Sequence, residues 1–184
     1  MRCSDSELVS ALPLFRSVCA VSFDRLMRDA SAQHFVQHTV LIKEGHLPRF
    51  LHILVEGSVE LVSHSAGRET TLDIIHPTAT FILATVIRNQ AYLKSARTLT
   101  SAKIVSIPAD AIREVFNRDD CFARAVAADL AVGYGRAIQT LKDLKLCNAT
   151  ERLANWILQS NHEQGDQGQI RLGHRNTHWP HDWE

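Results

Sequence analysis

The chain has 184 residues, and its 45% apolar content is enough to bury the core of one domain or slightly more. Twenty Lys and Arg residues balance twenty Asp and Glu residues, which excludes a chain that binds nucleic acid over its whole surface. The apolar runs are too short to span a membrane and the N-terminus lacks an apolar signal core, so we expect a cytoplasmic protein with no membrane partner.

Short helices are predicted before any strand. Residues 4–12 read as a helix that Ser4 or Ser6 caps and that ends near Pro13. Ser22 is placed to cap a second short helix, which continues to about Met27. These segments form a helical lead-in to the β-rich region that follows.

Alternating apolar residues then predict a series of short strands. Ile53 and Val55, Val59 and Leu61, and Leu72 and Ile74 alternate as expected for one buried face. Gly57 is the residue that tolerates the positive φ of a tight turn, so we expect two antiparallel strands joined there. Residues 81–87 are almost all apolar and fit a buried strand or a short buried helix. The predicted strands cover residues 35–42, 50–55, 58–63, 70–75, 97–100 and 103–107, which favours a barrel or jelly roll.

A helical pattern replaces the strands after Pro108. Residues 110–117 predict one helix, and residues 119–146 predict a long one with apolar positions spaced by four and three. This stripe fits either a helix packed on its own barrel or the seam of a parallel dimer. We favour the dimer because the stripe is longer than a small barrel can cover. The predicted interface consists of Ala123, Ala127, Leu130, Tyr134, Ala137, Leu141 and Leu144.

The chain beyond residue 146 is mixed in character. Asn148 is placed to cap a further helix over residues 149–160, and residues 170–172 look like the start of a strand. Residues 173–184 fit neither the helical nor the strand period. We therefore expect one more helix, the beginning of a strand and an irregular tail.

The order of these elements resembles the Crp/Fnr superfamily of bacterial transcription regulators. The resemblance implies an α+β fold in four parts: a cyclic-nucleotide-binding-like sensor β-roll (1–117), a dimerisation helix (118–147), the start of a winged helix-turn-helix domain (148–172) and an aberrant tail (173–184). The stretches that carry it are L-P-L-F (12–15), K-E-G (43–45), H-I-L-V-E-G-S-V-E-L (52–61), Y-L-K-S-A-R-T-L (92–99) and L-C-N-A-T-E-R-L-A (146–154).

The same resemblance places the effector pocket at Phe81, Ala84, Lys94 and Ser95. In family members that bind cyclic AMP, a glutamate binds the ribose, and an arginine followed by a serine binds the phosphate. Here Ala84 stands at the glutamate position and Lys94 at the arginine position, while Ser95 is kept. Alanine accepts no hydrogen bond and lysine lacks the two-pronged grip of arginine. We therefore predict weak or no binding of cyclic AMP and an effector of unknown identity.

Other sensing chemistries have less support in the sequence. Cys3, Cys19, Cys121 and Cys147 are too scattered for a metal knuckle or an iron–sulfur cluster, and we expect buried or idle thiols. A lone histidine beside strands is more often a surface or core residue than a haem ligand, so we expect no cofactor. The candidate haem ligands are His34, His38, His46, His52, His64 and His76.

A regulator of this kind would continue into DNA-reading helices, and residues 173–184 do not supply their pattern. Reading the reverse-translated tail two bases out of phase allows S-K-H-T-L-A-S-R-L-G, which resembles the first helix of that module. We interpret the tail as the product of a frameshift near Leu172, with a deliberate short form as the alternative. In that short form, His174, His178 and His181 would be candidate metal ligands, but a flexible tail does not pre-set the geometry, so we expect no metal site.

The resemblance implies a homodimeric transcription regulator that is not an enzyme and that binds DNA weakly or not at all as this chain. The alternative is a stand-alone β-roll that binds a small ligand or a protein partner. An enzyme of the cupin kind is disfavoured because the H-x-H spacing of such sites is absent.

Overall fold

The computed structural model describes residues 3–65 and 67–163, which belong to two compact units, Met1–Ala131 and Val132–Glu184. The helices are α1 (Cys3–Ser10), α2 (Pro13–Arg16), α3 (Ala20–Arg28), α4 (Leu83–Arg88), α5 (Ala109–Arg118), α6 (Asp120–Leu146) and α7 (Ala149–Glu163). The strands are β1 (Ser31–Phe35), β2 (Val40–Ile42), β3 (Phe50–Glu56), β4 (Val59–Ser65), β5 (Arg68–Ile75), β6 (Ala79–Phe81), β7 (Ser95–Thr98) and β8 (Ala102–Pro108).

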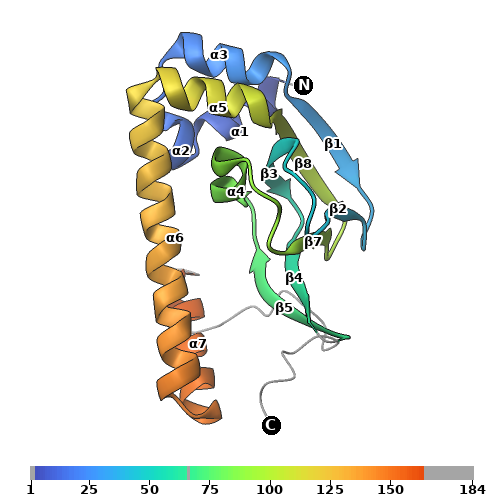
Figure 1. Ribbon diagram of the computed structural model, residues 1–184, viewed down its shortest axis with the longest axis vertical. Helices are drawn as coiled ribbons and strands as arrows, with labels where there is room; N and C mark the ends of the chain where they lie inside the picture. The colour runs from blue at the N-terminus through green and yellow to red at the C-terminus, as the bar shows by residue number, and fades with distance from the viewer. Residues whose placement is uncertain (1–2, 66, 164–184) are drawn as a thin grey trace. The chain divides into compact units, whose positions relative to one another are not determined.

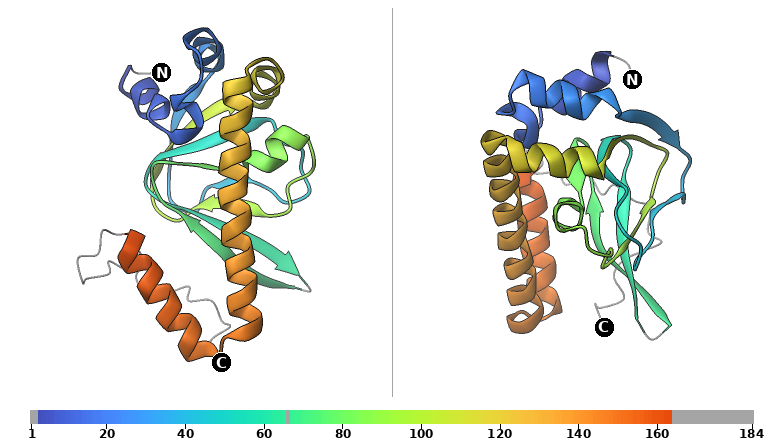
Figure 2. Two further views of the ribbon diagram at one scale, coloured as in Figure 1. Left: turned by 90° about the vertical axis from the view of Figure 1, so that its left-hand side faces the viewer. Right: turned by 45° about the horizontal axis from the view of Figure 1, so that its top comes forward.

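The strands of the first unit form two antiparallel sheets that make a β-roll, as the sequence predicted. One sheet has the order β1-β8-β3-β6 and the other the order β2-β7-β4-β5. Strands β4 and β5 pair along the chain from Val59–Ile75 to Ser65–Arg68, with one register shift, and extend as a long hairpin (Figures 1 and 2). The predicted α+β class and antiparallel roll are confirmed.

The turn at Gly57 has a different role from the one predicted. It joins β3 to β4, but these strands pair with other strands and lie in different sheets, so the expectation of a β3–β4 hairpin is wrong. Gly57 has φ +87°, and a Cβ there would lie 2.2 Å from the carbonyl oxygen of Ser101. Glycine is therefore needed twice, for the backbone conformation and for the close approach of the neighbouring chain.

Two hydrophobic cores lie on opposite faces of the sheet that contains β3 and β8. Successive strand residues point to opposite faces, so Leu51 and Ile53 pack against the helices while Leu54 packs inside the roll. The helical core includes Phe15, whose ring stacks on that of Phe122 at a centroid distance of 5.9 Å. Helices α1, α2, α3 and α5 thus cover one side of the roll (Figure 1).

Several predicted boundaries are corrected by the structure. The first strand was expected over residues 35–42, but β1 begins at Ser31, and residues 36–39 separate it from β2. Leu72 was expected in the buried face and is 54% exposed, because the β4–β5 register shifts at Leu61/Val62 and leaves Leu72 without a partner in the ladder. The open choice for residues 81–87 resolves as the end of β6 followed by the helix α4.

Helix α6 begins at a well-formed cap within the first unit. The Asp119 carboxylate accepts a hydrogen bond from the backbone N–H of Phe122 at 3.0 Å. Hydrogen bonds, of which this one contributes most, lower the pKa of Asp119 to about 2, so the cap stays ionised at neutral pH. Phe122 and Val126 follow the cap and are buried, which fixes the first turns of the helix on the helical core.

The second unit contains the later part of α6 and the helix α7. Asn148 caps α7 as predicted: its side chain accepts from Glu151 N–H at 3.0 Å, and the Glu151 carboxylate accepts from Asn148 N–H at 2.9 Å. The predicted strand at 170–172, the tail 173–184 and its three histidines lie outside the described residues. Over the described ranges, none of the helices is both long enough and apolar enough to cross a lipid bilayer.

Candidate functional site

The effector segment predicted from the sequence runs from β6 through α4 to β7. Phe81 is buried at the end of β6, and Ile82 follows in the left-handed conformation with φ +63°. A β-branched residue is strained there, and such strain is concentrated at functional segments. Leu83 is buried at the start of α4 and Ala84 is exposed, so the position expected to hold a ribose-binding carboxylate presents only a methyl group.

The other end of the segment is held by the β2–β3 connection. The Ser95 hydroxyl accepts a hydrogen bond from Glu44 N–H at 3.0 Å, and Lys94 is half-buried beside it. Gly45 N–H donates to the Tyr92 carbonyl at 2.8 Å, and Tyr92 N–H donates to the His46 carbonyl at 2.9 Å. Among the described residues, no hydrogen bond or ion pair joins any two of the four predicted pocket residues, Phe81, Ala84, Lys94 and Ser95.

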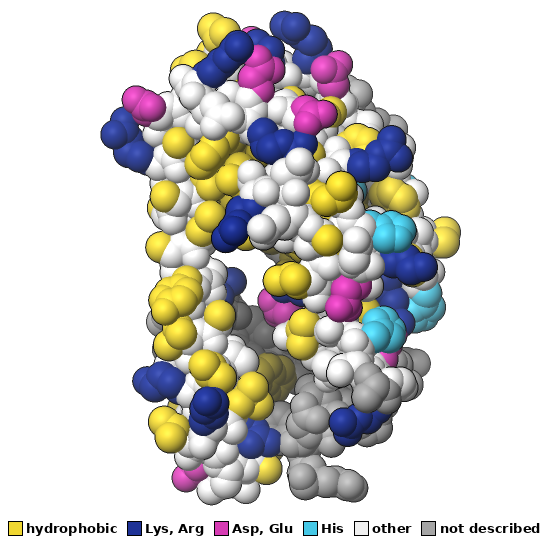
Figure 3. All heavy atoms as spheres, viewed as in Figure 1, with side chains coloured by type: hydrophobic (Ala, Val, Ile, Leu, Met, Phe, Trp, Pro, Cys, Tyr) yellow, Lys and Arg dark blue, Asp and Glu magenta, His cyan; other side chains and the backbone are white. Residues whose placement is uncertain are grey.

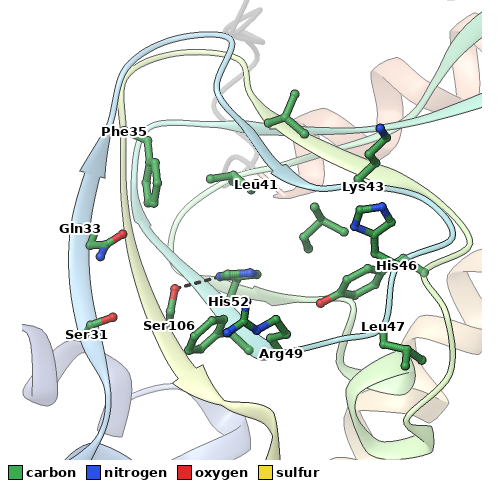
Figure 4. A pocket seen from close by; sticks show the side chains of 14 residues that line it. Ser31, Gln33, Phe35, Leu41, Lys43, His46, Leu47, Arg49, His52 and Ser106 are labelled. Atoms are coloured by element: carbon green, nitrogen blue, oxygen red, sulfur yellow. Dashed lines mark hydrogen bonds between the residues drawn. The ribbon is translucent and has the colours of Figure 1, made fainter.

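A cavity of about 350 Å³ opens inside the roll. It lies between β1 on one side and the β2–β3 connection on the other, with β3 and β8 between them (Figure 4). None of the four predicted pocket residues lines it. Its lining consists of Ser31, Gln33, Phe35, Val40, Leu41, Ile42, Lys43, His46, Leu47, Arg49, Phe50, His52, Tyr92 and Ser106.

His52 is the central polar group of this cavity. Its Nδ1 lies 2.9 Å from the Ser106 hydroxyl, across the β3–β8 pair. The ring stacks on Phe81 at a centroid distance of 5.7 Å and lies 6.2 Å from the Phe50 ring. Burial lowers the pKa of His52 to about 4, because the charged imidazolium loses its hydration there. His52 is therefore neutral at pH 7.

The six candidate haem ligands do not form one group. His52 and His46 both line the cavity, whereas His34, His38, His64 and His76 are exposed residues that do not. Within residues 3–65 and 67–163, no three side chains of His, Cys, Asp or Glu come together as a metal-binding group. Of the thiols expected to be buried or idle, Cys19 and Cys121 are exposed and Cys147 is half-buried.

A charged cluster on β4, β5 and β7 was not predicted from the sequence. Glu60 is 2% exposed and forms an ion pair with Arg97, which also pairs with Glu69 at 2.7 Å. His64 Nε2 lies 2.8 Å from Glu69 at the exposed end of the cluster. The hydrogen bond that Arg97 donates to Glu60 raises the pKa of Arg97. Because a buried carboxylate needs a charged partner, this cluster has a structural reason to exist.

The predicted dimer residues lie along α6. Tyr134 is 69% exposed, and Leu130, Leu141 and Leu144 are also exposed. Ala127 and Ala137 are exposed and Ala123 is half-buried. Apolar side chains are visible along this helix in Figure 3, and Val132 and Ile138 add to them without belonging to the predicted set.

Comparison with known proteins identifies the domain. Residues 32–119 match the family model of the cyclic nucleotide-binding domain. The chain is 25% identical over 174 residues to the CRP-like cAMP-activated global transcriptional regulator of Mycobacterium tuberculosis, a match that covers 93% of this chain and 78% of that one. The roll thus matches the cyclic nucleotide-binding domain in sequence over residues 32–119.

Solved structures have the same fold. The sensor domain of the transcriptional regulator DNR from Pseudomonas aeruginosa superimposes with a TM-score of 0.63 at 16% identity, covering 69% of this chain and 91% of that chain. The Thermus thermophilus catabolite activator protein gives a TM-score of 0.62 at 22% identity, covering 84% and 72%. These likenesses show the fold of the roll, and in sequence the chain is similar to a CRP-like transcriptional regulator.

Proposed function

We propose that this chain is the sensing and dimerising part of a Crp/Fnr-type transcription regulator, and that it is not an enzyme. The observation that carries the proposal is the junction at Asp119, where the sensor domain leads directly into a long helix with exposed apolar side chains. In such an arrangement, an effector that binds the two conformations of the sensor unequally shifts the packing of the helices.

We further propose that two protomers pair through the predicted α6 positions. Burying one Leu side chain contributes about 1.5–3 kcal/mol, so Leu141→Glu should weaken the dimer by roughly a hundredfold or more. The matched control is Gln139→Glu, which adds the same charge at an exposed α6 position outside the predicted seam. Light scattering after size exclusion measures the mass of each variant. A monomeric wild-type chain, or equal dimerisation of the two variants, would refute the proposed seam.

The effector of this regulator is proposed to be a molecule other than cyclic AMP. Ala84 supplies no acceptor for the ribose, and Lys94 supplies a point charge where an arginine fork would give two hydrogen bonds. Each lost charged hydrogen bond costs about 1.5–3 kcal/mol. Calorimetry with cyclic AMP should detect no binding at micromolar concentrations, and micromolar affinity would overturn this part of the proposal.

We propose that this chain alone binds DNA weakly or not at all and carries no haem. In support, acidic Glu151 stands beside basic Arg152 in the first turns of α7, and a DNA-reading surface needs an excess of positive charge. A gel shift with specific retardation by this chain would contradict the first statement. A Soret absorption band in protein grown with haem would contradict the second.

A stand-alone β-roll binding module is the second candidate function. The observation that favours it is the cavity inside the roll, since a ligand there needs no partner protomer. A monomer in solution that binds a ligand in this cavity would favour the module over the regulator.

A further inference from the structure

The rim of the roll cavity carries positive charge that no described carboxylate neutralises. Lys43 and Arg49 line the cavity and are exposed, and no acidic residue is among the lining residues. Within the described part of the chain, neither side chain forms an ion pair or a hydrogen bond. The nearest acidic neighbour in sequence, Glu44, accepts instead from the Ser63 hydroxyl at 3.4 Å.

The interior of the cavity is apolar and aromatic. Ile42 and Tyr92 are buried, and Phe35 and Leu41 are partly buried. Aromatic side chains prefer to stack against another ring, and apolar surface gains from excluding water. A positively charged rim above an apolar interior is the pattern expected for a ligand that has both an anionic group and an aromatic ring.

His52 adds one directional polar contact between these regions. Its Nδ1 is engaged by Ser106, whereas Nε2 has no hydrogen-bond partner among the described residues. A neutral imidazole donates from one nitrogen and accepts at the other. When the Ser106 hydroxyl donates to Nδ1, Nε2 carries the hydrogen and can donate it to an anion.

We propose that this cavity binds an organic anion with an aromatic body, its carboxylate facing Lys43 and Arg49 and its ring among the aromatic side chains. The volume of about 350 Å³ is within the range of roughly 300–1,000 Å³ usual for small-molecule sites. This site is separate from the predicted effector pocket, because Phe81, Ala84, Lys94 and Ser95 do not line the cavity.

Residues that line the cavity contact both ends of the segment that contains the predicted effector pocket, residues 81–95. Phe81, at its start, stacks on His52, and Tyr92, near its end, is a lining residue that hydrogen-bonds to the β2–β3 connection through its backbone. A ligand that orders His52 and the connection therefore acts on both ends of the segment. Naming the ligand an effector rests on the proposed regulator function, whereas the binding site does not.

The test uses the full 184-residue chain with 2-naphthoate as the probe and 2-naphthamide as its neutral counterpart, measured by calorimetry. We expect the amide, and the naphthoate with the variant Lys43→Gln/Arg49→Gln, to bind at least about tenfold more weakly than naphthoate binds the unaltered chain. Arg28→Gln/Arg88→Gln, which removes the same charge outside the cavity, should leave binding unchanged. Amide NMR shifts on binding should centre on His52 and Ser106.

Three results would overturn the proposal: no naphthoate binding, equal binding of the amide, or equal loss in the two double variants. NMR shifts confined to α6 would also overturn it, because they would place the probe on the exposed helix. Displacement of naphthoate by cyclic AMP would merge the two sites and contradict their separation. If the chain binds naphthoate as expected but is monomeric, the regulator proposal fails and the binding site stands.

Discussion

Replacing Gly57 with alanine tests the account of the β3–β4 turn. At φ +87°, an L-residue costs about 1–2 kcal/mol in backbone strain. The added Cβ would also lie 2.2 Å from the Ser101 carbonyl oxygen and 2.8 Å from the Ala102 Cα, and relieving such overpacking costs about 1–3 kcal/mol. The two effects predict that Gly57→Ala lowers the free energy of unfolding by about 2–5 kcal/mol.

Gly45→Ala is the matched control for this substitution. Gly45 has φ +82°, but a Cβ there would meet nothing within 4 Å, so only the backbone strain of about 1–2 kcal/mol applies. Urea unfolding followed by circular dichroism measures both variants, and with a slope of about 2 kcal/mol/M the midpoint for Gly57→Ala should fall by about 1–2.5 M. Equal losses in the two variants would refute the argument that close approach of the Ser101 backbone requires glycine.

Three further predictions concern side chains of the roll. The folded pKa of His52, about 4, lies below its unfolded value of 6.5, so the unfolded chain protonates first as pH falls and stability is lost between these values. Between pH 7.5 and pH 5, this protonation should lower the free energy of unfolding by about 2 kcal/mol, measured by urea unfolding, and His52→Phe should remove that loss. An unchanged pH dependence in His52→Phe would contradict this reasoning. Glu60→Gln should destabilise by about 1–3 kcal/mol and Glu69→Gln by less than about 1 kcal/mol, because only Glu60 is fully buried; the reverse order in the same assay would disprove this. The double variant Ala84→Glu/Lys94→Arg should bind cyclic AMP at least about tenfold more tightly, measured by calorimetry. No gain in affinity would argue against the assignment of these two residues to the effector pocket.

The sequence predicted best those features that short-range patterns determine. The long helix was placed within a residue of its observed start, and the cap at Asn148 was correct, because apolar spacing and cap chemistry are local signals. The first strand was misplaced because S-A-Q-H-F at residues 31–35 contains no β-branched residue. Leu72 was assigned to the core because a register shift between paired strands leaves no mark on the alternation of one strand.

The cavity could be predicted only in part. His52 has the same parity along its strand as Leu54, so the alternation already placed it on one face with an apolar residue. Its partner Ser106 is 54 positions away, and only the register of β3 against β8 brings the two together. The Glu60–Arg97 pair has the same origin, since it joins β4 to β7 across 37 positions.

Strands β3 and β8 contribute to both cores, so alternate positions along each strand tolerate different sequence changes. Residues 51, 53, 105 and 107 hold the helices in place, whereas 52, 54, 104 and 106 face the inside of the roll. Substitutions at the second set can alter what the roll accommodates while the helical packing is retained. Inserting or deleting a single residue in β3 would exchange the two sets and disrupt both cores at once. A protein built in this way can diversify its ligand by point substitution, but it cannot change the length of its central strand.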